Sequence, residues 1–93
     1  MNNIKEILIS KYEYTDYEAE VTSEDLNNMD PESMEVLSKL LEGNDISDYS
    51  YMDYSIGSLI SDYDFNPFSA LLSIVALKDD YEGFSKMLKK GFK

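Results

Sequence analysis

Apolar residues recur at intervals of three and four along much of the chain, which is the pattern of short amphipathic helices. The clearest example follows Asp30-Pro31, an N-cap residue with a proline at the first helical position. Met34, Leu37, Leu40 and Leu41 then occupy one face, and Gly43 is placed to end the helix in a left-handed conformation. The pattern therefore predicts a helix between residues 31 and 42.

The last third of the chain repeats this arrangement. Asn66-Pro67 is a second start signal, and the broad apolar face after it predicts a largely buried helix over residues 67–78. Asp79 or Asp80 is placed to cap a last helix over residues 81–90, which Gly91 would end. Lysines 86, 89 and 90 suit the negative end of that helix dipole.

The N-terminal third allows two interpretations. Residues 3–12 have the spacing of a helix, and Ser23-Glu24 begins what resembles a short capped helix. However, residues 12–14 and 17–21 alternate as strands do, with a turn at Thr15-Asp16 between them. A short N-terminal β-hairpin therefore remains open as the second interpretation.

Residues 46–65 read ISDYSYMDYSIGSLISDYDF, a segment rich in rings and carboxylates. At about 100° per residue, helical phase places Tyr49, Met52, Ile56, Leu59, Ile60 and Tyr63 on one buried face. Tyr51 and Tyr54 then lie on the exposed side, beside Asp48 and Asp62. Gly57 lowers helix stability by roughly 1 kcal/mol relative to alanine, which predicts a bend or a close packing contact there.

These elements together predict an all-α protein: a compact bundle of four to five short helices, with the N-terminal hairpin as the open alternative. The 93 residues form a single domain, residues 1–93, with no linker or low-complexity segment. No apolar run approaches the roughly 18 residues of a membrane span, and the first residues lack the apolar core of a signal peptide. We therefore expect a soluble, cytoplasmic protein.

The charge of the chain adds most to this prediction, because it indicates which partners the surface can bind. The chain has 19 acidic residues against 8 lysines, with no arginine or histidine, and a net charge of −11. Residues 13–64 contain fifteen acidic residues and one lysine, so they carry a charge of −14. Such a surface repels nucleic acid and anionic membranes and attracts basic proteins, although acidity also simply favours solubility. With 43% hydrophobic residues, the chain is too apolar for a disordered acidic tail, so its charge should lie on a fixed surface.

The same composition argues against enzymatic chemistry. The absence of histidine and cysteine removes the commonest general bases and nucleophiles, and no glycine-rich loop is present. Asp62, Asp64 and Asn66 have the spacing of the first calcium ligands of an EF-hand, but Pro67 and Ser73 stand where glycine and glutamate are needed. Helix capping explains these residues better. We expect no catalysis, no cofactor and no metal.

The candidate chemistry is instead that of a contact surface. Carboxylates held on a rigid face can imitate a row of phosphates, and exposed tyrosines supply contact area at low entropic cost. Two patches combine these features, and together they form the candidate partner-binding set: Asp48, Tyr51, Asp53, Tyr54, Asp62 and Asp64 in the first, and Tyr14, Asp16, Tyr17, Glu18 and Glu20 in the second.

Two resemblances add to this reading. Phe84-x-x-Met87-Leu88-x-x-Gly91 resembles the signature of the second helix of an ankyrin repeat, which implies packing as a helix pair. In size, acidity and richness in tyrosine and aspartate, the chain also resembles small anti-defence proteins of phages, such as anti-CRISPR proteins and DNA mimics. That resemblance implies a non-catalytic inhibitor in the cytoplasm of a bacterial host cell, where it occupies the nucleic-acid channel of a host effector.

The expected partner is therefore a basic host protein, a nucleic-acid-binding nuclease or effector complex, with no direct contact to nucleic acid or membrane. The oligomeric state, monomer or dimer, stays open. A helical adaptor that uses an apolar groove, and an immunity or antitoxin protein that neutralises a basic toxin, are the alternative functions.

Overall fold

The computed structural model describes residues 4–90 and has an all-α fold, as the sequence predicts. Six helices form within the described residues, one or two more than expected, together with one very small antiparallel hairpin. The elements are α1 (Ile4–Tyr12), α2 (Asp16–Asn27), α3 (Pro31–Leu41), β1 (Ser50–Tyr51), β2 (Tyr54–Ser55), α4 (Ile56–Tyr63), α5 (Pro67–Asp79) and α6 (Tyr81–Lys89).

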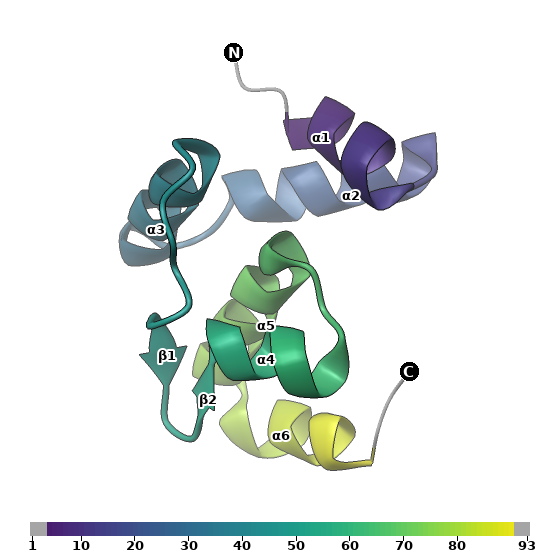
Figure 1. Cartoon of the computed structure of the whole chain (residues 1–93). Coiled ribbons are helices and arrows are strands. Elements are labelled where there is room, and N and C mark those ends of the chain that lie inside the picture. The colour runs from purple at the N-terminus through teal and green to yellow at the C-terminus, as the bar shows by residue number, and fades with distance from the viewer. Residues whose placement is uncertain (1–3, 91–93) are drawn as a thin grey trace.

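The helices surround α5. Figure 1 shows α1 and α2 packed together across one end, α4 and α6 at the other end, and α3 with the hairpin along one side. Each of the six helices contributes at least one side chain to a single cluster of buried apolar residues, and α5 contributes the most. The fully or almost fully buried large members are Ile4, Leu8, Leu26, Leu37, Ile56, Leu59, Phe68, Leu71, Ile74, Leu77 and Leu88.

The residues predicted to cap the helices do so in the structure. The carboxylate of Asp30 accepts a hydrogen bond from the backbone N–H of Ser33 at 3.2 Å, and the side-chain oxygen of Asn66 accepts one from Ser69 at 2.9 Å. Asp80 caps α6 in the same way. Gly43 follows α3 with a φ of +89°, the left-handed conformation expected there. Gly91, predicted to end α6, lies outside the described residues.

The N-terminal hairpin interpretation is wrong, because residues 16–27 form one continuous helix. Thr15 and Glu18 build a reciprocal capping box at its start: the Thr15 hydroxyl accepts from the Glu18 N–H at 3.1 Å, and the Glu18 carboxylate accepts from the Thr15 N–H at 3.0 Å. The short helix expected from Ser23 is the second half of this same helix. Residues 4–12 are helical as predicted.

The predicted helix over residues 46–65 is also wrong in its first half. The chain there forms a loop and the β1–β2 hairpin, in which Tyr51 pairs with Tyr54, and helix α4 starts only at Ile56. Tyr54, expected on the surface, is 8% exposed, whereas Met52, expected in the core, is 67% exposed. Tyr49 and Tyr63 are half-buried, and Ile56 and Leu59 are buried as predicted.

Two serines explain where α4 begins. The Ser55 hydroxyl accepts from the Ser58 N–H, and the Ser58 hydroxyl accepts from the Ser55 N–H, both at 3.1 Å, so the pair forms a capping box with serine in place of glutamate. Gly57 lies in the first turn against the loop before the hairpin, where an added Cβ would stand 3.2 Å from the Cβ of Ser47. The close contact predicted at this glycine is confirmed.

No helix formed by residues 4–90 combines the length and the apolar character needed to cross a lipid bilayer.

Candidate functional site

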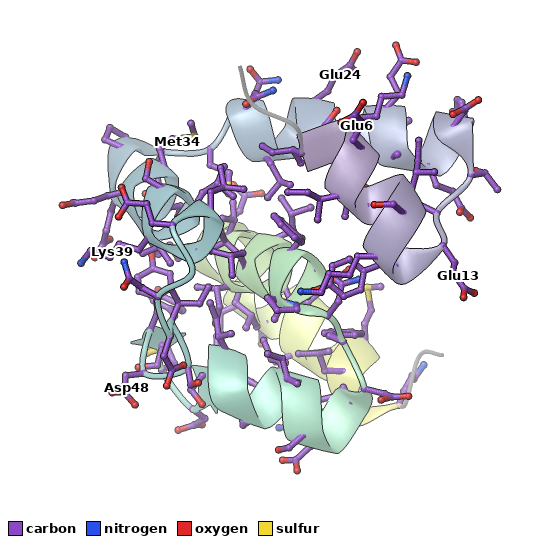
Figure 2. The ribbon with its side chains drawn as sticks, turned by 45° about the horizontal axis from the view of Figure 1, so that its top comes forward. Glu6, Glu13, Glu24, Met34, Lys39 and Asp48 are labelled. Atoms are coloured by element: carbon purple, nitrogen blue, oxygen red, sulfur yellow. The ribbon has the colours of Figure 1, made fainter. Side chains whose placement is uncertain are left out.

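Most carboxylates on the described surface have no basic partner. Among residues 4–90, ion pairs join Lys5 to Glu20 at 3.8 Å, and Lys78 to Asp30 and Glu32 at 3.5 and 3.1 Å. Figure 2 shows Glu6, Glu13 and Glu24 directed outward from the α1–α2 end, and Asp48 outward from the opposite side of the molecule. The excess negative charge is therefore displayed to solvent rather than neutralised internally.

Lys78 is the exception, because it lies at the centre of a partly buried polar network. Its ammonium donates to the Tyr49 hydroxyl at 2.7 Å and to Glu32 at 3.1 Å. Desolvation lowers the pKa of Lys78, but these hydrogen bonds and the charge of Asp30 outweigh it and raise the pKa above its ordinary value. This lysine holds α3, the loop before the hairpin and α5 together, and it is not available to an external anion.

Asp30 belongs to the same network. The Ser33 hydroxyl donates to the Asp30 carboxylate at 2.9 Å, and Ser33 itself is fully buried. The hydrogen bonds from Ser33, with a smaller contribution from Lys78, lower the pKa of Asp30 despite some desolvation. Asp30 therefore remains ionised as a helix cap and ion-pair partner.

The first predicted patch, which we call the hairpin face, is turned partly inward. Tyr51 and Tyr54 both contact the ring of Tyr81 at the start of α6, with ring centroids 6.3 and 6.2 Å apart. The Tyr81 hydroxyl donates to Asp53 at 3.2 Å, and desolvation together with this carboxylate raises the pKa of Tyr81. Tyr51 and Tyr54 therefore attach the hairpin to α6, and Tyr54 is not an exposed anchor.

The remaining members of the hairpin face are exposed but are not gathered in one place. Asp48 precedes β1, whereas Asp62 and Asp64 stand at the far end of α4. The eight residues of α4 span about 12 Å, and the hairpin and the loop into α5 leave from its opposite ends (Figure 1). Asp64 ends α4 with a φ of +63°, so its position is set by the turn that it forms.

The EF-hand spacing within this segment belongs to helix ends, as the alternative interpretation predicted. Asp64 is the C-cap of α4, and Asn66 is the N-cap of α5. Within the described part of the chain, no three acidic side chains come close enough together to hold a metal ion.

The second predicted patch lies on α2 and is much more open. Tyr17 is 78% exposed and Val21 is 39% exposed, although both are apolar. Helical phase places these two on one stripe, with Asp16, Glu20 and Glu24 along one side and Glu18 along the other. We call these six residues the acidic face of α2. It combines an aromatic centre with a carboxylate rim, on a helix that buries only Ala19 and Leu26.

Tyr14 has a different role from the rest of its patch. Its hydroxyl lies 2.9 Å from that of Ser69 and accepts a hydrogen bond from the Asn66 side chain at 3.0 Å. These bonds join the turn before α2 to the start of α5, so Tyr14 fixes where the acidic face stands. Its ring also lines a shallow hollow of about 350 Å³ together with Tyr17, Glu18, Val21 and Thr22.

A second hollow of about 410 Å³ lies between the end of α2 and α5. Its apolar lining is formed by Met29, Leu72, Val75 and Ala76, all of them partly buried, and its rim carries the exposed carboxylates of Asp25 and Asp79. We call these six residues the α2–α5 groove. The sequence predicted a largely buried α5, and this stripe is a part of the helix that its neighbours cover only partly.

Three of these surface features escaped the sequence interpretation. Val21 and Glu24 lie four and seven residues after Tyr17, a helical spacing that could be recognised only once residues 16–27 were known to form a helix. The α2–α5 groove joins residues about 50 positions apart in the chain, and no local pattern brings them together.

Comparison of the chain with protein-family models, with curated proteins and with solved structures found no match. Function has to be argued from the charge and shape of the surface alone.

Proposed function

We propose that this protein is a non-catalytic inhibitor that binds a basic, nucleic-acid-binding protein, such as a nuclease or an effector complex. The acidic face of α2 occupies the site where the partner holds nucleic acid. The observation that carries the proposal is the exposed tyrosine at the centre of a carboxylate rim, on a helix whose acidic residues are mostly unpaired.

The spacing of the carboxylates supports imitation of a phosphate backbone. Asp16, Glu18, Glu20 and Glu24 fall within nine residues of helix, so the first and the last are about 12 Å apart at 1.5 Å per residue. That is about one negative charge per 4 Å, close to the roughly 3.4 Å per charge along one DNA strand. A groove lined with lysine and arginine for nucleic acid would therefore meet a similar charge density on α2.

The rigidity of α2 also supports its proposed role as a mimic of the phosphate backbone. The capping box fixes the first turn of α2, and Tyr14 fixes the preceding turn against α5. Because the backbone that carries these carboxylates is fixed before binding, less conformational entropy is lost when the partner binds. Tyr17 adds a ring of large area with few rotatable bonds, which suits an anchor at the centre of a contact.

The experiment is affinity capture from a bacterial lysate on the immobilised protein, followed by binding measurements with the captured partner. Affinity should fall by at least about tenfold between about 50 and 200 mM salt, because opposite charges attract through solvent. The variant Glu20→Lys/Glu24→Lys should lose most of the binding. The control Glu35→Lys/Glu42→Lys, which makes the same change in net charge on α3 and its C-cap, should retain it.

Two outcomes would overturn the proposal: salt-independent binding, or equal loss in the two variants. An immunity or antitoxin protein would use the same acidic face against a basic toxin. It would be recognised by a captured partner that binds no nucleic acid.

A further inference from the structure

Helix α5 is apolar around most of its circumference, which is the pattern of a helix enclosed on all sides. Contacts from α2, α3, α4, α6 and the hairpin cover most of it. Leu72, Val75 and Ala76 nevertheless remain partly exposed, with Asp79 following at the end of the same stripe. Leu72 and Met29 pack against the core on one side, so the α2–α5 groove is an apolar surface that the described fold covers only in part.

The dimensions of the groove suit a helix. Leu72, Val75, Ala76 and Asp79 are positions i, i+3, i+4 and i+7, so they form one stripe about 10 Å long at 1.5 Å per residue. A partner helix whose apolar side chains recur at the same spacing presents a stripe of the same length. Met29 closes one side of the groove and gives an adaptable apolar wall.

The rim determines the charge of the occupant. Asp25 and Asp79 are exposed beside the apolar lining and take part in no ion pair among residues 4–90. Lys78 also borders this region, but its ammonium is already bound by Tyr49 and Glu32. An acidic or neutral helix would leave the rim carboxylates without partners, whereas lysine or arginine beside the apolar stripe would pair with them.

We propose that the α2–α5 groove binds a basic amphipathic helix of the partner protein. This inference rests on the proposed function and extends it: the acidic face of α2 engages the basic nucleic-acid site, while the groove holds a neighbouring helix of the same partner. Apolar residues of that helix contact Leu72, Val75 and Ala76, and its basic residues pair with Asp25 and Asp79. The negative charge of the protein then attracts the basic partner, and the match between the groove and the apolar stripe of the partner helix makes the binding specific.

The test uses two synthetic peptides of about 14 residues, or about four helical turns, composed of leucine and lysine. In one peptide the leucines recur at i, i+3, i+4 and i+7; the other has the same composition in scrambled order. The 93-residue chain should bind the first at least tenfold more tightly. Val75→Gln/Ala76→Gln, which keeps the net charge, should reduce the affinity for the amphipathic peptide to that for the scrambled one. The acidic-face variant Glu20→Lys/Glu24→Lys should preserve the preference.

Equal affinity for the two peptides, or unchanged binding by the groove variant, would show that the α2–α5 groove does not bind a basic amphipathic helix. The proposed function would then still stand. Failure of both peptides to bind at low salt would overturn both proposals together. Amide chemical shifts of the wild-type protein give a readout that does not depend on a variant folding. The amphipathic peptide should move the signals of Met29 and residues 72–79. If those signals move with protein concentration alone, the occupant is a second copy of this chain and the proposal is wrong.

Discussion

At the scale of single residues, the tyrosines differ in whether the fold uses them. Tyr54 is buried against Tyr81, and the hydroxyls of Tyr14 and Tyr49 hold hydrogen bonds between distant segments. Tyr17 projects from α2 and is 78% exposed. A large ring in that position adds little to folding, so its value to the protein should lie in contact with another molecule.

Alanine substitutions should separate these roles. Tyr54→Ala removes a buried ring and should lower the free energy of unfolding by about 3 kcal/mol. Tyr17→Ala should change it by no more than about 0.5 kcal/mol, because the side chain is on the surface. Urea unfolding followed by circular dichroism measures both. Similar losses in the two variants would mean that Tyr17 is part of the core.

The lowered pKa of Asp30 predicts that the stability of the protein depends on pH. Because its pKa is lowered in the folded protein, its ionised form contributes stability above the unfolded value of about 3.9. That contribution is lost as pH falls through the lower folded pKa. Asp30→Asn keeps an N-cap residue but removes the titration. The difference in unfolding free energy between wild type and Asp30→Asn should be constant near neutral pH and shrink below about pH 4. A difference that stays constant to pH 2 would contradict this account.

At the scale of elements, the helix starts that could be predicted are those marked by a capping residue directly before the helix. Asp30-Pro31, Asn66-Pro67 and Asp80 each cap the helix that follows, as the sequence indicates. The N-terminal region was ambiguous because residues 12–14 and 17–21 alternate as strands do between two predicted helices, and the Thr15–Glu18 capping box is what favours the helix.

The hairpin could not be predicted in the same way. Its turn, Met52-Asp53, lacks the glycine or asparagine that marks tight hairpins, and Met52 adopts a φ of +56° there. The strands are held by packing on Tyr81, about 30 residues further along the chain. Of the candidate site, the acidic residues of α2 could be chosen from composition, but the α2–α5 groove depends on tertiary packing.

The capping box gives a prediction for α2 itself. Thr15→Ala removes the hydroxyl that accepts from Glu18 and should destabilise the protein by about 1 kcal/mol. Thr15→Ser keeps that hydroxyl and should remain close to wild type. Amide hydrogen exchange would show faster exchange in the first turn of α2 in Thr15→Ala alone. Equal protection in the two variants would mean that Tyr14 and the packing on α1 suffice to hold this turn.

At the scale of the whole molecule, a net charge of −11 with few ion pairs among residues 4–90 means that the folded protein repels itself. We expect the melting temperature to rise as salt is added at neutral pH, because screening weakens this repulsion more than it weakens the few ion pairs. The variant Glu35→Lys/Glu42→Lys, with a net charge of −7 instead of −11, should respond less to salt. A melting temperature that falls with salt in both proteins would show that the ion pairs dominate.

The same surplus of charge is what the proposed function uses. Carboxylates that the protein does not pair internally remain available to a basic partner, and the field they create acts over about a Debye length, about 8 Å at physiological salt. The acidic face of α2 would contribute the attraction at closest approach, and the rest of the acidic surface would increase the rate of encounter.

Competition for the partner tests this account most directly. A fluorescent DNA duplex is bound to the captured partner, and its anisotropy is followed as the acidic protein is added. The account predicts that the wild-type protein releases the DNA at close to one equivalent, that Glu20→Lys/Glu24→Lys does not, and that Glu35→Lys/Glu42→Lys does. If the protein binds the partner while the DNA stays bound, the acidic face does not occupy the nucleic-acid site, and the central claim is wrong.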